Sequence, residues 1–518
     1  MQIQKSTSAL LFHLLFVLFV AGQTETHLPR SVPEKEGVSS AAIIQFLEAA
    51  DKSKTSFHSF MLLRHGKVIA EGWWNPYRPD LLHTLYSTSK SFTATAVGFA
   101  VHEKLLSLDD KVKSFFPGQA PDTADIKLEQ LTVKDALMMS DGQEPDPTYK
   151  IVKDSNWIRS FLSTPIKYEP GTKFLYNTLG TYMLSAIVQK VTGKPILEYL
   201  QPRLFAPLGI TGIDWETDSK GVNTGGWGLR LKTEDIAKFA QLFLQKGKWE
   251  GKQILPEGWV EEASTMKIMQ NPDAPQSKKD SSDWLQGYCY QMWRCRNNAY
   301  RGDGAFGQFM IVMPDQDAAI AITAETADMQ EEIDLVWKYL LPAFKNDPLP
   351  ANRKGQKKLR ARLQTLALAP VKSTKTVPSN QINGKKFLFA ANDFLFKSLS
   401  FTTNKNGITL NLETTKASYP LSFGEGKWIQ GTTEKTVPSL LKADTGASYI
   451  KDEFLYPAKV TGSYSWRDPQ TLQLVLRFIE SPHAETYTCH FDGNKLTMDL
   501  EKSLWSGNRK QTFTATRE

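Results

Sequence analysis

The chain has 518 residues, of which 41% are hydrophobic and 23% are charged, as in an ordinary folded protein. Its formal net charge of +7 is spread along the sequence, apart from one basic cluster at 354–362, and does not indicate a nucleic-acid partner. The length is too great for one compact core and predicts two or three domains.

The N-terminus has Lys5, an apolar run over 10–21 and then Gly22. A short basic start, an apolar stretch of this length and small residues at the cut predict a secretory signal peptide over 1–22. We therefore expect a periplasmic or secreted protein without stable membrane insertion after cleavage. The alternative is an uncleaved anchor.

Three cysteines are an odd number, so at least one is unpaired in an oxidising compartment. Cys289 and Cys295 lie in an aromatic run over 287–296 that predicts a strand. In an extended strand they are about 20 Å apart, beyond the reach of a disulfide, which predicts small buried apolar residues. No Cys/His spacing indicates a metal, and we expect neither a metal nor an organic cofactor.

Up to residue 346 the pattern predicts a mixed α/β body whose sheet draws strands from both ends of the segment. Taken in chain order, the expected elements are an amphipathic helix over 39–50, a hairpin over 60–72, helices over 87–103, 108–117, 132–140, 180–191 and 233–247, strands over 287–296, 306–313 and 318–324, and a closing helix over 328–344.

The composition and the hydrophobic pattern of the sequence change after Pro348. Residues 347–384 predict a basic helix and a linker, and 385–518 predict an all-β domain, either a small barrel or a sandwich. Its alternating runs are 407–413, 471–478, 484–491 and 496–500, the last after an Asp492-Gly493 turn. The aromatic residues Trp428, Tyr464, Trp466 and Trp505 are compatible with carbohydrate contact or with docking and core filling, and we favour the second interpretation.

The run Ser87-Thr88-Ser89-Lys90 is the most informative motif. Ser-x-x-Lys spacing at the start of a helix places the hydroxyl and the amine on one face, about one turn apart. Lysine can take the serine proton only if burial keeps it partly neutral, and the apolar residues from Phe92 to Ala100 predict such burial. The same spacing also occurs at Ser264–Lys267 and Ser439–Lys442, so the spacing alone is not specific.

Two further segments make the motif specific. They are Tyr176-Asn177-Thr178, which follows Pro170-Gly171, and Gly302-Asp303-Gly304-Ala305, which precedes an apolar strand. In order and separation, the three segments resemble the serine β-lactamase and penicillin-binding-protein superfamily, in its class C, DD-peptidase and esterase branch. The resemblance covers 30–346 and implies an antiparallel sheet flanked by helices, with an all-helical subdomain.

The resemblance implies an acyl-enzyme mechanism. Ser87 would attack a carbonyl while Lys90 and Tyr176 share the proton, with Lys90 lowering the pKa of the phenol. The N–H groups of Ser87 and Ala305 would form an oxyanion hole, and Gly302 and Gly304 would let the substrate approach closely.

Aromatic residues offer candidate walls for the cleft. Trp227, in the glycine-rich stretch 223–229, is either a wall or a core residue. The same choice holds for the aromatic groups 73–77 and 284–290, which include Trp73, Trp74, Tyr77, Trp284, Tyr288 and Tyr290.

Two departures from the family pattern bear on the substrate. Where the pattern has Tyr-x-Asn, this chain has Thr178, with Asn177 one place earlier; we expect both near the substrate. Where the family has Lys or His, this chain has Gly302 followed by Asp303, so a substrate carboxylate loses its counter-ion unless Arg294, Arg296 or Arg301 reaches in.

These departures favour hydrolysis of an ester, or less readily an amide, by a serine hydrolase. The substrate would be a small molecule or derived from cell wall or carbohydrate. Alternatives are a D-Ala-D-Ala peptidase, a D-amino-acid amidase or a β-lactamase, and, in a different class, a catalytically silent binding or sensor protein.

Overall fold

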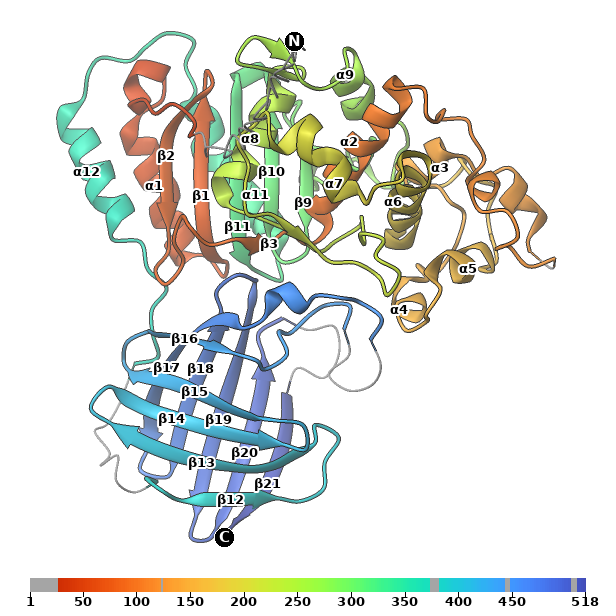
Figure 1. Ribbon diagram of the computed structural model, residues 1–518. Helices are drawn as coiled ribbons and strands as arrows, with labels where there is room; N and C mark the ends of the chain where they lie inside the picture. The colour runs from red at the N-terminus through yellow and green to blue at the C-terminus, as the bar shows by residue number, and fades with distance from the viewer. Residues whose placement is uncertain (1–26, 123, 373–381, 443–447, 505–509) are drawn as a thin grey trace, which may run out of the picture.

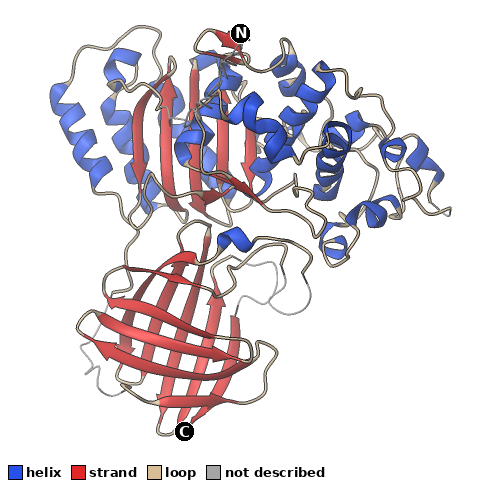
Figure 2. Ribbon diagram, viewed as in Figure 1, coloured by secondary structure: helices blue, strands red, loops and turns tan. Residues whose placement is uncertain are grey.

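Two bodies make up the described part of the chain, which comprises residues 27–122, 124–372, 382–442, 448–504 and 510–518 of a computed structural model (Figure 1). Helices flank a sheet in the first body, whereas the second consists almost entirely of strands (Figure 2). The predicted signal peptide 1–22 lies outside the described residues, so it and the periplasmic or secreted location stay predictions. Within the described ranges, no helix combines the length and apolarity of a membrane span.

A six-stranded antiparallel sheet forms the centre of the first body, with the strand order β2, β1, β11, β10, β9, β8. Its strands are β1 (Ser56–Arg64), β2 (Lys67–Trp73), β8 (Trp293–Arg294), β9 (Tyr300–Gly304), β10 (Gln308–Met313) and β11 (Ala318–Glu325). Strand β1 pairs with β11 from Ser56 opposite Glu325 to Arg64 opposite Ala318. The two ends of the segment therefore meet in one sheet, as predicted.

Helices α1 (Ser40–Lys52), α11 (Met329–Leu335) and α12 (Arg353–Gln364) pack on one face of this sheet, and α2 (Ser89–His102) and α8 (Thr233–Leu244) pack on the other. A helical subdomain lies to one side of the sheet and consists of α3 (Val133–Leu137), α4 (Thr148–Ile151), α5 (Trp157–Leu162) and α6 (Thr178–Thr192) (Figure 1). Helix α7 (Ile196–Leu200) packs on α2 and α6, and α9 (Trp259–Ser264) and α10 (Gln276–Ser281) lie in the segment between α8 and β8. Successive side chains of β1 alternate: Phe60 and Leu62 join the core of α1, α11 and α12, and Met61 and Leu63 join that of α2 and α8. The basic helix predicted after residue 346 thus packs on the first body.

Two element predictions need correction. The strand expected over 287–296 is wrong except for Trp293–Arg294, because Gly287 (φ 104°) and Gln291 (φ 57°) take left-handed conformations that interrupt an extended chain. The closing helix expected over 328–344 divides into α11, a π turn (Val336–Leu340) and a 3-10 turn (Leu341–Ala343). All three cysteines of the chain are described, and each is buried and unpaired.

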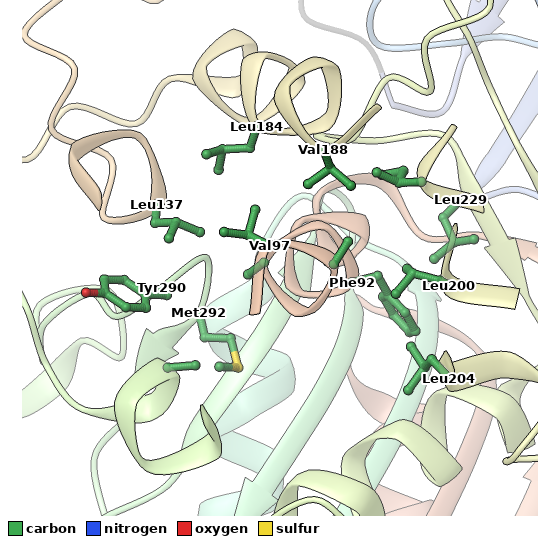
Figure 3. Packing of buried hydrophobic residues seen from close by; sticks show 14 of the residues in the cluster. Phe92, Val97, Leu137, Leu184, Val188, Leu200, Leu204, Leu229, Tyr290 and Met292 are labelled. Carbon is green, nitrogen blue, oxygen red and sulfur yellow. The ribbon is translucent and has the colours of Figure 1, made fainter. Parts of the chain in front are cut away.

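Helix α2 is buried on every side. Every residue from Ser89 to Ala100 is buried, and Phe92 and Val97 lie among side chains from several elements (Figure 3). Those neighbours include Leu137, Leu184, Val188, Leu200, Leu204 and Met292. A lysine in the first turn of this helix is therefore removed from water, as its apolar surroundings in the sequence predict.

The second body is a closed nine-stranded barrel rather than a sandwich. Its strands are β12 (Lys386–Phe389), β13 (Phe396–Asn404), β14 (Gly407–Thr414), β15 (Ser418–Glu425), β17 (Ala458–Asp468), β18 (Thr471–Phe478), β19 (His483–Asp492), β20 (Lys495–Lys502) and β21 (Lys510–Arg517). A further short strand, β16 (Ile429–Thr433), pairs with the first half of β17. Strands β15 and β17 close the ring in parallel, through Gly424 opposite Ser463. Every second residue of β18 is buried, which is the alternation of a barrel wall.

The aromatic residues of this barrel mostly serve its structure. Tyr464 and Trp466 are buried in its core. Trp428 donates its indole N–H to the carbonyl of Leu368 at 2.9 Å, which ties the barrel to the segment after α12. Trp505 lies outside the described residues. The two core residues and the Leu368 contact agree with core filling and docking.

One end of the barrel docks on the first body beside the short strands β3 (His83–Thr84), β4 (Asp214–Trp215) and β5 (Leu229–Leu231). The amide of Thr84 donates to the carbonyl of Glu480 at 2.9 Å, and Arg230 pairs with the Glu480 carboxylate at 3.2 Å. Arg477 of β18, whose side chain is 14% exposed, forms an ion pair with the buried Glu325 at the end of β11. The barrel thus contacts the segment that leads directly to Ser87.

Candidate active site

A cavity of about 400 Å³ opens over Ser87, between the sheet, the helical subdomain and the barrel. Its walls come from segments far apart in the chain: Tyr86, Ser87, Asp146, Thr148, Tyr149, Tyr176, Thr178, Trp227, Trp284, Trp293, Asp303, Ala305, Met329, Leu440 and Leu441. Six residues predicted from sequence for the site or its walls are among them: Ser87, Tyr176, Thr178, Trp227, Trp284 and Ala305. The volume suits a small-molecule group.

Ser87 lies in a 3-10 turn, Tyr86–Thr88, that continues into α2. Lys90, one helical turn further on, is 1% exposed, and its Nζ is 3.1 Å from Ser87 Oγ. Burial lowers the pKa of Lys90 to about 7, although the carboxylates of Asp146 and Asp303 raise it. A substantial fraction of Lys90 is therefore uncharged at neutral pH and within reach of the serine proton.

Two further oxygens lie within hydrogen-bond distance of Lys90. Its Nζ lies 2.8 Å from the carbonyl oxygen of Gly226 and 3.3 Å from Thr178 Oγ1. With Ser87 Oγ these make three oxygen partners, which the charged amine fills with three N–H donors; the neutral amine keeps two donors for Gly226 and Thr178 and turns its lone pair to the Ser87 hydroxyl. Thr178, which stands in the asparagine position of the family pattern, thus contacts the lysine directly.

The pKa of the Tyr176 phenol is shifted in the opposite direction to the one expected. Its ring stacks on Trp293 at 5.7 Å, and Lys90 Nζ lies 4.9 Å from the ring centroid. Burial raises the pKa of the Tyr176 phenol, which the hydrogen bond to Ser87 only partly offsets. The net shift is therefore opposite in direction to the lowering that was expected from Lys90, and the phenol keeps its proton at neutral pH.

Ala305 follows the last residue of β9, the strand that packs against the Tyr86–Thr88 turn. Gly302 and Gly304 face that turn and α2. A Cβ on Gly304 would lie 1.9 Å from the carbonyl oxygen of Leu85, and one on Gly302 would lie 2.7 Å from Ser91 Oγ. The glycines therefore allow β9 to approach the turn that contains Ser87.

Gly304→Ala should lower the rate of Ser87 acylation by about 100-fold, because β9 must move away from the Leu85 carbonyl and carry Ala305 with it. The rate of labelling by a fluorophosphonate checks this. Gly431→Ala is the matched control: its Cβ would meet nothing closer than Val460 at 4.0 Å, so the rate should not change. Equal labelling rates for the two variants would contradict the inference that Gly304 is needed to place Ala305 beside Ser87.

Asn177 does not line the cavity, although its neighbours Tyr176 and Thr178 do. It is fully buried, and its side-chain oxygen accepts from the amides of Leu179 and Gly180, each at 3.1 Å, as the N-cap of α6. Its amide nitrogen donates to Gln143 at 3.0 Å. The side chain thus secures the start of α6 and is not among the cavity-lining residues.

The three arginines considered as counter-ions all have partners within the protein and do not line the cavity. Arg301 is fully buried and donates to Asp303 Oδ2 at 2.9 Å. Arg294 donates to Asn298 at 2.7 Å, and Arg296 pairs with Asp283 at 2.7 Å. Among the described residues that line the cavity there is no Lys, Arg or His, whereas Asp146 and Asp303 are present.

Several wall residues were not found from sequence. Asp146 and Tyr149 lie in a proline-rich segment that matches no motif, although its two prolines indicate a loop. Leu440 and Leu441 come from the β-domain, where nothing in the sequence indicates a role in the site. Of the two aromatic groups, only Trp284 reaches the wall; Trp74 stacks on Phe57 in the core, at 5.4 Å.

No group of three His, Cys, Asp or Glu side chains within the described ranges is arranged to hold a metal. The site as described consists of a serine, a lysine, a tyrosine and a strand end with two glycines. This is the arrangement of a serine acyl-transfer enzyme.

Comparison with known proteins gives the same class. A model of the Beta-lactamase family matches residues 48–341, more than half of the chain. The chain therefore belongs to the β-lactamase family and is a serine hydrolase related to the β-lactamases and penicillin-binding proteins.

The individual relatives differ in name. A 6-aminohexanoate-dimer hydrolase of Paenarthrobacter ureafaciens is 26% identical over 287 residues, which span 52% of this chain and 72% of that protein. A protein of Escherichia coli K12, provisionally named a D-alanyl-D-alanine carboxypeptidase, is 32% identical over 144 residues, or 25% of this chain and 33% of that protein. A solved Bacillus anthracis structure, provisionally named a 6-aminohexanoate-dimer hydrolase, has a TM-score of 0.50 at 20% identity and covers 62% of this chain and 87% of its own.

Proposed function

We propose that the protein hydrolyses uncharged carboxylic esters of small molecules through an acyl-enzyme on Ser87. The observation that carries this proposal is the charge of the cavity wall: among the described lining residues there are two carboxylates and no cation. Arg301 pairs with Asp303, whereas Asp146 is partly exposed, accepts hydrogen bonds from Thr148 and Thr178, and forms no ion pair in the described chain; its charge acts on Lys90 from a distance. A substrate carboxylate placed here would be repelled rather than paired.

The mechanism follows from the two pKa shifts. Neutral Lys90 accepts the Ser87 proton as Oγ attacks the carbonyl, and the N–H groups of Ser87 and Ala305 stabilise the oxyanion. The protonated Tyr176 phenol then donates to the leaving oxygen and recovers a proton from Lys90, which restores both groups. Water repeats the sequence on the acyl-enzyme.

Hydrolysis of an ester fits better than hydrolysis of an amide. The Thr178 hydroxyl that replaces the family's asparagine is already in contact with Lys90, and Asn177 is engaged as a helix cap. The Asn177 amide is therefore not free to recognise a substrate amide, and the Thr178 hydroxyl keeps only one donor and one acceptor site for it. The same wall charge disfavours β-lactams and D-Ala-D-Ala peptides, which carry a carboxylate.

The test has two parts. Intact-mass analysis after fluorophosphonate treatment should give one adduct that maps to Ser87 and is absent from Ser87→Ala. Turnover of a neutral p-nitrophenyl ester should exceed that of an isosteric ester with a terminal carboxylate by at least about tenfold. In Asp146→Asn the ratio of the two turnover rates should be smaller, because one of the repelling carboxylates is gone.

The alternatives give different results. An adduct without turnover of any ester or amide would indicate the silent binding protein. Faster turnover of the carboxylate substrate, or of a D-Ala-D-Ala peptide, would overturn the ester proposal.

A further inference from the structure

The residues on either side of the catalytic pair have unusual backbone conformations. Tyr86, immediately before Ser87, has φ 46°, and Phe306, immediately after Ala305, has φ 72°. L-residues other than glycine rarely adopt this left-handed region, and they stay there only where surrounding contacts hold them. Both halves of the oxyanion hole are thus attached to residues that need external support.

One residue of the barrel contacts both of them. His483, the first residue of β19, is 1% exposed, and its Nε2 forms a short hydrogen bond with the hydroxyl of Tyr86. The ring of Phe306 meets Tyr86 edge-on at 5.5 Å and His483 edge-on at 5.5 Å. The three rings form one cluster, which joins the barrel to Ser87 and to Ala305.

The hydrogen-bond direction in this cluster is determined by its burial. Burial lowers the pKa of His483 to about 4, and the nearby charges of Lys502, Glu485 and Glu325 modify it less. Burial also raises the pKa of the Tyr86 phenol, so Tyr86 donates and the neutral imidazole accepts at Nε2. The amide of Leu440, a cavity-wall residue from the barrel, donates to the same phenol oxygen at 3.4 Å.

We propose that His483 is a positioning residue for catalysis: through Tyr86 and Phe306, the β-domain holds Ser87 and the Ala305 amide in register. This inference rests on the proposed Ser87 chemistry. This positioning role differs from simple docking of the β-domain, because other interface contacts, such as the Arg230–Glu480 pair, hold the barrel without contacting the Tyr86–Thr88 turn. The β-domain is then part of the active enzyme.

The test replaces His483 in the full-length chain. His483→Phe keeps the ring but removes the acceptor, and should lower both kcat for a neutral ester and the rate of fluorophosphonate labelling by about 10- to 100-fold, with KM changed less than threefold. His483→Gln places a carbonyl oxygen near the Nε2 position and should restore the rate to within about threefold of wild type. His490→Phe, an exposed histidine on the same strand, is the matched control and should have no effect.

A second variant covers the case in which His483→Phe does not fold. Tyr86→Phe removes the donor instead and should give the same loss of kcat, and combining it with His483→Phe should add little if the two act as one unit. Wild-type labelling by folded His483→Phe, or an equal loss in His483→Gln, would overturn the inference. Failure of wild-type protein to label at Ser87 would overturn the proposed function instead, so the two failures are distinguishable.

Discussion

Lys90→Met should lower kcat/KM for a neutral ester by about 10²- to 10⁴-fold, the usual contribution of a general base. The Nζ of Lys90 is 3.1 Å from Ser87 Oγ, and burial brings its pKa to about 7. Lys90→Arg should fail equally, because a guanidinium stays charged and cannot accept the serine proton.

The pH profile gives an independent readout. Because the active form of Lys90 is the free amine, wild-type kcat/KM should rise with pH and reach half its maximum near pH 7. The groups that face Lys90 are Asp146, the Arg301–Asp303 pair and Tyr176, and the two carboxylates raise its pKa. Asp146→Asn should therefore move the midpoint to lower pH.

The second Ser-x-x-Lys pair supplies the control. Lys267 pairs with Glu262 at 2.7 Å, away from the cavity, so Lys267→Met should leave kcat/KM unchanged. More than a tenth of wild-type activity in Lys90→Met, or a flat profile between about pH 5 and pH 9, would exclude Lys90 as the base.

Arg477→Met should lower the free energy of unfolding by about 3–5 kcal/mol, the cost of leaving the buried member of an ion pair alone. Although burial by itself raises the pKa of Glu325, the Arg477 guanidinium holds that pKa below its ordinary range. Removing the guanidinium leaves a buried carboxylate at the junction of β11 and the barrel. Urea unfolding followed by circular dichroism measures the loss.

Two further variants test whether the unpaired carboxylate causes the loss of stability. Glu325→Gln combined with Arg477→Met removes both charges and should recover much of the lost stability, because the isolated carboxylate is gone. Lys510→Met breaks the exposed Lys510–Asp499 pair and should change stability by less than about 1 kcal/mol. A loss below about 1 kcal/mol in Arg477→Met would show that the pair does not stabilise the docked barrel.

The local patterns in the sequence predict much of the fold. The start of the nucleophile helix and its apolar surroundings depend on contacts within a few residues, and α2 covers the range expected for it. The alternation of β18 likewise predicts a half-buried strand, whereas the choice between a barrel and a sandwich came only from the structure. The strand expected over 287–296 is wrong because Gly287 and Gln291 turn the backbone, and the aromatic residues there are buried by other segments.

The sequence by itself determined the class of protein, because Ser87–Lys90, Tyr176–Thr178 and Gly302–Ala305 each form a short motif with its own local geometry. Only the tertiary structure decided the environment of these groups. The lowered pKa of Lys90, the raised pKa of Tyr176 and the absence of a cation from the described cavity wall all depend on burial by distant segments. The contact of His483 with Tyr86 joins residues 397 positions apart, and no local pattern in the chain encodes a pairing over that distance.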